Sequence, residues 1–278
     1  MGAVHLTVSD IARSRDFYER AIGLSASEHD GGTIGLGAGD GEALVELYGD
    51  SSARQLDRHA TGLFHLAVLV PSRRDLAFAL RRLADYRWSL DGASDHLVSE
   101  ALYLSDPDGN GIEIYRDRPR DQWRRIDGQL QMATLPLDLR GVIDELGDED
   151  STHPLAPSGT RIGHTHLQVA ELERTEAFYS GVLGFDVVVR GYPGALFVSA
   201  GGYHHHLGLN TWNSAGSGPA AAGSIGLRSF EVVLPGEPEL DAVLGRVSDA
   251  GLPIEPAAQH ASHIVRDPSG NKVELRAA

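Results

Sequence analysis

Two histidines and a glutamate have the residue types and positions of a metal site: His65, Glu113 and His164. The chain has 13 histidines and no cysteine, so any bound metal must be held by nitrogen and oxygen rather than by thiolate sulfur. Two neutral imidazoles and one carboxylate on one face suit a divalent iron or manganese ion and leave three adjacent coordination positions open. These three residues are therefore the predicted metal ligands.

The choice of these positions depends on an internal duplication of the chain. Segment 4–10 (VHLTVSD) is followed by Phe17-Tyr18, and segment 165–171 (THLQVAE) by Phe178-Tyr179, at an offset of 161 residues. The same offset relates the turn segments 106–113 (DPDGNGIE) and 267–274 (DPSGNKVE). A further similarity, between segments 62–71 and 226–235, indicates that each half consists of two units.

Each unit has the pattern of a strand, a helix and two or three further strands. The predicted fold class is therefore α+β, with four βαβββ modules over roughly 2–50, 61–118, 161–213 and 223–276. The predicted division is an N-terminal half (1–118), a linker (119–160) and a C-terminal half (161–278). A short helix is expected to open at 118–123, and the acidic segment 144–150, followed by Pro154 and Pro157, is typical of a solvated linker.

Comparison of the units separates residues that the fold requires from residues that it does not. Where a residue is polar in one unit but apolar at the matching position of another, the fold does not require the polar side chain. The pairs are His164 and Ala3, His205 and Leu44, His65 and Ser229, His96 and Ala257, and Tyr103 and Ile264, whereas Glu113 is matched by Glu274. The imidazoles therefore concentrate in the two central units. Within the run 204–206, strand alternation allows either His205 alone or its two neighbours to point inward.

Composition excludes several classes of protein. The 278 residues are enough for two domains, and 41% hydrophobic with 23% charged residues indicates a globular chain. A formal charge of −15 disfavours nucleic acid as a partner. No stretch approaches the roughly 20 apolar residues of a membrane helix, so no membrane partner is expected. The lack of cysteine and of an N-terminal targeting pattern predicts a cytoplasmic location.

At these residues the sequence resembles the vicinal oxygen chelate superfamily, and within it the type I extradiol ring-cleaving dioxygenases. The resemblance covers nearly the whole chain, and two vicinal-oxygen-chelate barrels are the fold it implies. It rests on Gly163-His164 with Phe178-Tyr179, the segment 201–206 (GGYHHH), segment 62–65 (GLFH), Asp95-His96 before Tyr103, and the segment 106–113. The Phe-Tyr helix and the Asp-Pro turn are typical of the superfamily, whereas the histidine and tyrosine set is more specific.

The resemblance implies a role for each of six residues. His65, His164 and Glu113 match the family's metal-ligand positions, His205 matches its catalytic histidine, and His96 and Tyr103 match a histidine and a tyrosine that hydrogen-bond the substrate. The implied cofactor is Fe(II), with Mn(II) as the second choice, and the implied reactants are a small aromatic diol and O2. The expected reaction cleaves the ring next to the diol.

The order of the units departs from the family pattern, in which both units of the active barrel come from the C-terminal half. Units 2 and 3 pairing across the linker is favoured here, with units 1 and 4 forming a metal-free barrel. If each half closed on itself instead, the C-terminal site would use His164, Glu274 and a histidine from 204–206.

Two rival functions remain open on this scaffold. A glyoxalase-type isomerase would use two carboxylates, for which Glu46 could join His65 and Glu113 if the halves close separately. A bleomycin-resistance-type protein would sequester a ligand without metal chemistry. The sequence leaves open which diol is the substrate and whether the protein forms a homo-oligomer.

Overall fold

Alternation along the strands determines which face of each sheet packs against the helices. The computed structural model describes residues 1–39, 41–126, 129–147, 155–257 and 262–278. On β5 (Gly62–Leu69), Leu66 and Val68 belong to the main hydrophobic core, while His65 and Ala67 lie on the opposite face. Because successive side chains of a strand point to opposite faces, each sheet has an apolar face and a face on which polar residues are placed.

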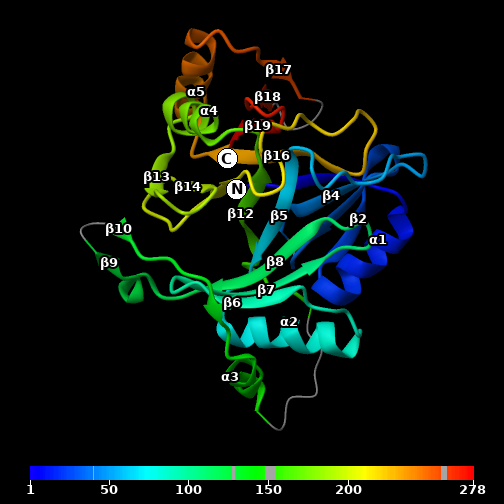
Figure 1. Cartoon of the computed structure of the whole chain (residues 1–278). Coiled ribbons are helices and arrows are strands. Elements are labelled where there is room, and N and C mark those ends of the chain that lie inside the picture. The colour runs from blue at the N-terminus through cyan, green and yellow to red at the C-terminus, as the bar shows by residue number, and fades with distance from the viewer. Residues whose placement is uncertain (40, 127–128, 148–154, 258–261) are drawn as a thin grey trace.

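Within the described residues, most strands belong to two mixed sheets (Figure 1). The first sheet has the order β17 (Glu255–Pro256), β18 (His263–Arg266), β19 (Lys272–Ala277), β16 (Gly226–Leu234), β1 (Val4–Val8), β4 (Ala43–Gly49), β3 (Ile34–Gly37), β2 (Ser25–Glu28). The second has the order β11 (Leu135–Pro136), β6 (Gly92–Asp95), β7 (Ser99–Ser105), β8 (Gly111–Asp117), β5, β12 (Arg161–Gln168), β15 (Leu207–Asn210), β14 (Ala195–Ser199), β13 (Asp186–Val189). A small hairpin joins β9 (Arg125–Ile126) to β10 (Gln129–Leu130).

The four predicted βαβββ modules are confirmed, and each sheet takes one module from each half of the chain. The first sheet combines modules 1 and 4, and the second combines modules 2 and 3. Each sheet curls into a half-barrel. The fold class is α+β, because the sheets are mixed and helices cover them. The pairing of units 2 and 3, favoured above, is what the strand order shows. The division of the chain at 118 and 161 stays a prediction. The two sheets do not separate at those residues, since each sheet contains strands from both halves.

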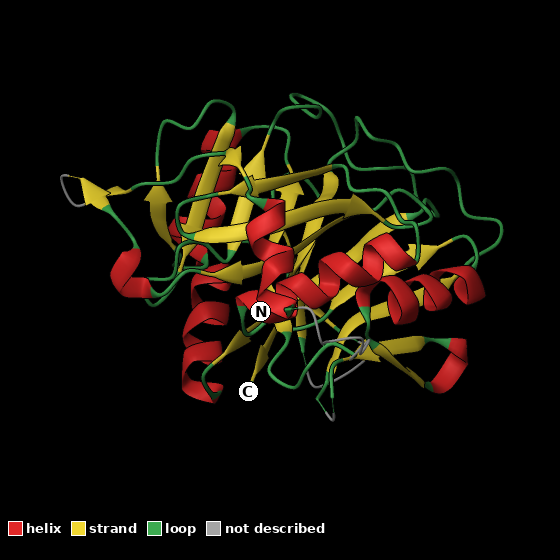
Figure 2. Ribbon diagram, turned by 90° about the horizontal axis from the view of Figure 1, so that it is seen from below, coloured by secondary structure: helices red, strands yellow, loops and turns green. Residues whose placement is uncertain are grey.

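One helix from each module covers the apolar faces of the sheets (Figure 2). These helices are α1 (Ile11–Phe17) with its π-helical continuation η1 (Tyr18–Ile22), α2 (Arg73–Asp85), α4 (Leu172–Glu176) with the π-helical η5 (Ala177–Val182), and α5 (Glu237–Asp249). The helices of modules 1 and 2 pack together, as do those of modules 3 and 4. Sheets therefore join the halves, and helices join the modules within each half. No helix in the described part of the chain has the length and apolar character needed to cross a bilayer.

The repeated Phe-Tyr and Asp-Pro motifs are partners in the folded chain. The Tyr179 hydroxyl on η5 donates to Asp267 Oδ2 over 3.1 Å, and the equivalent Tyr18 hydroxyl on η1 lies 3.4 Å from Asp106 Oδ2. Both tyrosines are fully buried. The π-helical turn lets both residues of each Phe-Tyr pair point into the core. Gly184, with φ 91°, ends the second of these helices in a left-handed conformation that favours glycine.

Replacing Tyr179 by phenylalanine is expected to lower the free energy of unfolding by about 1–3 kcal/mol, because a buried hydrogen bond to a carboxylate is lost. Urea denaturation followed by circular dichroism measures this change. The same substitution at Tyr86, a half-buried tyrosine whose solvent-exposed hydroxyl also bonds an aspartate, serves as the control and is expected to cost under about 1 kcal/mol. Equal effects at both positions would contradict a structural role for the motif.

Part of the predicted linker is packed rather than solvated. The expected short helix at 118–123 is one 3-10 turn, η3 (Arg120–Gln122). Beyond it, α3 (Leu139–Ile143) and the 3-10 turn η4 (Asp144–Leu146) lie against α2, and Val142 and Leu146 are buried there. The acidic segment therefore begins with an apolar contact to α2, which its charge pattern did not predict. Its remainder at 148–150, and Pro154, lie outside the described residues.

Candidate functional site

His65, Glu113 and His164 converge on the polar face of the second sheet. Their strands are neighbours in the order β8, β5, β12. Glu113 and His164 are both cross-strand partners of Ala67, one on each side, and His65 lies two residues earlier on the same face of β5. The register between three strands thus brings together residues that are far apart along the chain.

The three side chains meet within hydrogen-bonding distance and are almost entirely buried. Glu113 Oε2 lies 3.0 Å from His65 Nε2 and 3.1 Å from His164 Nε2, and these two nitrogens lie 3.3 Å from each other. Either two N–H groups crowd against one oxygen, or one cation lies among the three atoms. Buried, paired donors of this kind are typical of a metal site.

The protonation states match those of metal ligands. Burial lowers the pKa of His164 to about 4, so its imidazole is neutral at physiological pH. Burial alone would raise the pKa of Glu113, but His164 and His65 hold it well below its usual range, so it remains a carboxylate. Neutral imidazole and ionised carboxylate are the forms that bind metal. The residues present therefore fit a divalent ion held by two nitrogens and one carboxylate.

His96 and Tyr103 form a hydrogen-bonded pair beside this cluster. His96 Nδ1 lies 2.7 Å from the Ala133 carbonyl oxygen, which can only accept, so Nδ1 carries a proton. In the neutral ring Nε2 then accepts from the Tyr103 hydroxyl, 2.7 Å away. Burial and nearby Glu113 raise the pKa of Tyr103 well above its usual value. Tyr103 is therefore a protonated hydroxyl held at the edge of the cluster.

His205 is the inward histidine of the run 204–206. Its ring centre lies 4.2 Å from that of His164, and its Nδ1 lies 2.8 Å from Nδ1 of His204. His204 Nε2 lies 2.8 Å from a carboxylate oxygen of Asp117, to which it donates. In the neutral ring of His204, Nδ1 then accepts from His205 Nδ1–H, which leaves His205 Nε2 unprotonated. Burial lowers the pKa of His205 well below its ordinary value, so the ring is a neutral base.

A cavity of about 190 Å³ brings the six predicted residues together. Its wall includes all of His65, His96, Tyr103, Glu113, His164 and His205. The aromatic residues Phe197 and Trp212 also line it. The volume and the aromatic wall suit a single small ring more than an extended ligand.

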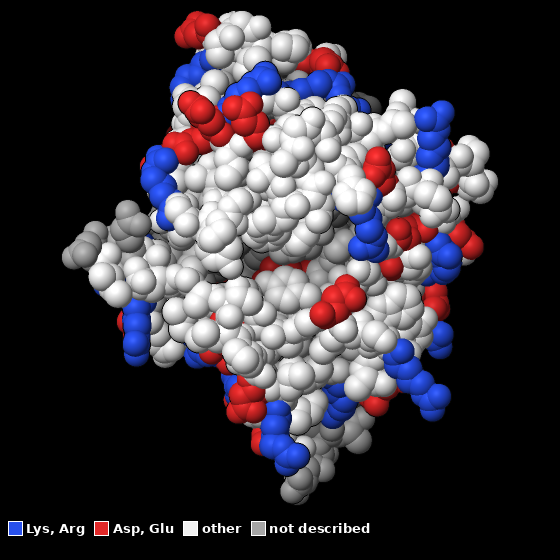
Figure 3. Space-filling model, viewed as in Figure 1, with Lys and Arg blue, Asp and Glu red and all other residues white. Residues whose placement is uncertain are grey.

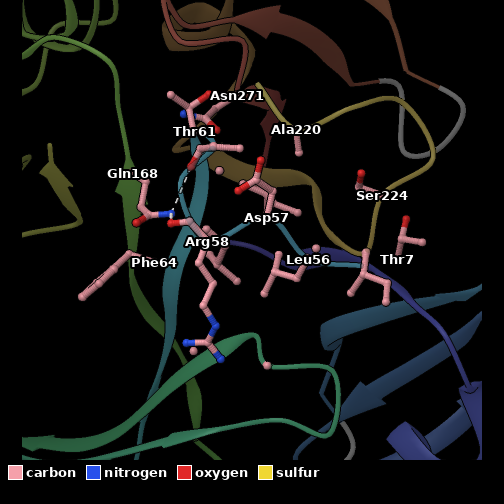
Figure 4. A pocket seen from close by; sticks show the side chains of 18 of the residues that line it. Thr7, Leu56, Asp57, Arg58, Thr61, Phe64, Gln168, Ala220, Ser224 and Asn271 are labelled. Carbon is pink, nitrogen blue, oxygen red and sulfur yellow. Dashed lines mark hydrogen bonds between the residues drawn. The ribbon is translucent and has the colours of Figure 1, made fainter. Parts of the chain in front are cut away.

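A larger cleft, of about 1040 Å³, opens beside this cavity (Figure 4). The two share Phe64, His65 and Tyr103 in their walls, and Gln168 closes part of the cleft by donating to the carbonyls of Arg58 and Ala60. Of the six predicted site residues, His65 and Tyr103 line both spaces, and the other four line only the smaller cavity. The face in Figure 3 is hollowed near its centre, with acidic atoms visible inside the hollow and further acidic atoms at its rim.

Two arrangements that the sequence left open are wrong. Glu46 lies on β4 and Glu274 on β19, both in the first sheet, whereas His65, Glu113 and His164 lie in the second. Glu46 therefore does not join His65 and Glu113, and Glu274 does not join His164. The reason is that sheet pairing crosses the two halves, so neither half closes on itself.

Sequence reasoning missed two residues next to the site. His166 lies on the cavity wall with its ring centre 4.8 Å from that of His65, and its Nε2 accepts from Asn210 Nδ2. Its position two residues after His164 on one strand was a sufficient signal. Asp117, which orients His205 through His204, had no comparable signal, because it belongs to a different module.

Comparison with known proteins agrees with this architecture. The model of the Glyoxalase/Bleomycin resistance protein/Dioxygenase superfamily matches residues 1–114 and 161–275. A catechol-2,3-dioxygenase from Bacillus subtilis (strain 168) is 45% identical over 272 residues, covering 96% of this chain and 93% of the relative.

Two solved structures share the fold at low sequence identity. A putative dioxygenase from Bacillus subtilis subsp. subtilis str. 168 aligns with a TM-score of 0.67 at 15% identity, over 100% of this chain and 85% of that one. Glyoxalase I from Zea mays aligns with a TM-score of 0.60 at 17% identity, over 99% and 91%. From the family match over both halves and the close relative, this chain belongs to the glyoxalase/bleomycin resistance protein/dioxygenase superfamily.

Proposed function

We propose that this protein is an extradiol dioxygenase that cleaves a small catechol next to its vicinal diol, using Fe(II) and O2. The observation that carries the proposal is the convergence of His65, Glu113 and His164 on one wall of a cavity that also contains His205 and Tyr103. The 45% identical relative named catechol-2,3-dioxygenase supports the same reaction class. The absence of cysteine supports a cytoplasmic location.

His65, His164 and Glu113 would hold the iron, with Mn(II) as the alternative. When bound, such an ion supplies Lewis-acid and one-electron chemistry that allows an aromatic diol to react with dioxygen. The net reaction inserts both atoms of O2 and breaks one ring carbon–carbon bond, which gives a 2-hydroxymuconic semialdehyde type of product. No other oxidant or reductant is required.

The remaining residues move or hold protons. His205 Nε2 is the unprotonated nitrogen of a buried neutral imidazole, so it can take a proton from a substrate hydroxyl and return it later. Asp117 and His204 keep His205 in this tautomer. Tyr103 remains protonated and donates to His96 Nε2, so its oxygen is left to accept a hydrogen bond from a substrate hydroxyl. The aromatic wall excludes water from the reacting groups.

The test uses protein purified anaerobically and loaded with Fe(II). Adding catechol is expected to cause oxygen uptake and to produce a yellow ring-fission product at a matching rate. The chelator-treated protein is the control and should do neither. Zinc or nickel retained through purification, with no oxygen uptake after iron loading, would overturn the proposal in favour of an isomerase.

Replacing Tyr103 by phenylalanine is expected to lower kcat about three- to tenfold, because one hydrogen bond from a substrate hydroxyl is lost. The iron content should equal that of the parent protein, since the hydroxyl is not a ligand in this proposal. Stopped assays of the yellow product and metal analysis measure the two quantities. Phenylalanine in place of Tyr192, which also lines the cavity, tests whether any lost hydroxyl has the same effect.

A further inference from the structure

A second cluster of metal-binding residues lies on the polar face of the first sheet, where the sequence predicted no metal. His5 on β1, Glu231 on β16 and Glu274 on β19 each offer a ligand atom, and these atoms lie within 4.8 Å of one another. His5 and Glu231 are buried, and Glu274 is partly buried. The three strands are neighbours or next neighbours in the sheet.

His5 presents an unsatisfied nitrogen to this cluster. The Tyr48 hydroxyl donates to Glu46 Oε2, so it accepts from His5 Nδ1–H, 3.3 Å away. The neutral ring then carries its lone pair on Nε2, which is buried and has no hydrogen-bond partner among the described residues. That nitrogen lies 3.4 Å from Glu231 Oε1. Two lone pairs therefore face each other unless a proton or a metal ion lies between them.

The carboxylates are oriented from outside the cluster. Arg276 Nε and the Ala3 amide both donate to Glu231 Oε2, which leaves Oε1 facing His5. The Ser229 hydroxyl donates to Glu274 Oε1 over 2.5 Å. Outer hydrogen bonds that fix a histidine tautomer and orient carboxylates are typical of metal sites.

Strand register shows that this cluster is not a remnant of the first one. Glu231 pairs with Glu274 as Ala67 pairs with Glu113, so Glu231 occupies the position of Ala67. In the same way His5 pairs with Ser229 as His166 pairs with His65, so His5 occupies the position of His166. Only Glu274 has a counterpart among the ligands of the other sheet. The cluster is thus built from a different set of positions on the same kind of face.

From this geometry we propose that His5, Glu231 and Glu274 bind a second divalent metal ion that links the first module to the last. One imidazole with two carboxylates suits a first-row ion that accepts oxygen ligands, and Mn(II) is the probe of choice. None of the three residues lines the site cavity or the neighbouring cleft, so the ion has no access to substrate there. Its role is structural, since it ties β1 to β16 and β19.

The experiment counts Mn(II) bound to the full-length chain after chelation, reloading and desalting, by elemental analysis. The parent protein is expected to bind two ions per chain, the Glu113→Gln variant one, and the Glu113→Gln/His5→Gln double variant none. The control double variant is Glu113→Gln/His59→Gln, in which an exposed histidine is changed instead of His5. It should still bind one Mn(II) ion per chain. Equal Mn(II) binding in Glu113→Gln and in its His5→Gln derivative would overturn the proposal.

A thermal readout keeps the test independent of ring cleavage. In the Glu113→Gln background, Mn(II) at a hundredfold excess over its Kd is expected to raise the melting temperature by about 5–10 °C. The shift should disappear with His5→Gln. Should that variant not fold by circular dichroism, Glu274→Gln takes its place with the same expected loss.

The alternative occupant of the cluster is a proton on His5. Burial alone would lower its pKa, but the carboxylates of Glu231, Glu274 and Glu46 raise it above its ordinary value. Arg276 and His29 contact these carboxylates, and Arg228 lies over the ring of Tyr48 beside them. A buried imidazolium would give stability that is present at low pH and lost as the pH rises through the folded pKa. Such a loss, with no effect of Mn(II) on the melting temperature, would overturn the metal proposal.

Discussion

Glutamine in place of Glu113 is expected to reduce catechol cleavage to the rate of the chelator-treated parent protein. Glu113 Oε2 lies within 3.1 Å of both imidazole Nε2 atoms, and an uncharged amide of the same shape removes the anionic donor. A site built from two neutral imidazoles and an amide binds a divalent ion far more weakly. The measurements are oxygen uptake with catechol and the iron content after desalting.

The control for this variant makes the same chemical change elsewhere. Glu176→Gln, on α4, removes a carboxylate that pairs with Arg190 at the surface. It should keep the parent's iron content and turnover. If Glu113→Gln retained its iron and its activity, Glu113 would have no place in the metal site, and the proposed function would lose its main support.

Alanine in place of His205 is expected to lower kcat by about 10²–10⁴-fold while leaving the iron in place. The ring of His205 lies beside that of His164 but contributes no atom to the cluster of Glu113 Oε2 and the two Nε2 atoms. Its imidazole is neutral and is held by His204, so it is the free base of the cavity. Loss of this base removes proton transfer but not a metal ligand. Single-turnover rates and iron content together separate these two effects.

His206→Ala is the matched control, because it removes the next imidazole along the chain. That ring hydrogen-bonds Ser199 and the Ala200 amide and does not line the cavity. It should change kcat by less than about threefold. A loss of iron in His205→Ala as large as in Glu113→Gln would show that His205 is a ligand and not a proton carrier.

The inverted arrangement of the modules that carry the candidate site has a simple structural basis. Modules 2 and 3 supply the imidazoles, and they share a sheet because β5 pairs with β12 across the linker. The helices bind each module to its neighbour in sequence, so both sheets remain attached to one core. A duplicated chain can therefore build two half-barrels with different chemistry on their polar faces.

The sequence alone determined the modules and the residues that differ between them. Alternation and turn residues are local signals, so the four βαβββ units and their order could be predicted from the chain. The contrast between His65 and Ser229, or His164 and Ala3, identified the central modules without any coordinates. These inferences needed only local patterns and a comparison of the repeated units.

Strand pairing and side-chain orientation were decided only by the tertiary structure. Which modules share a sheet depends on long-range register, which excluded Glu46 and Glu274 from the first site and placed Glu274 with His5. The tautomer of His205 depends on Asp117, a residue 88 positions away in another module. A sequence specifies each residue's local preference, whereas the convergence of buried polar atoms arises only when distant strands are brought into register.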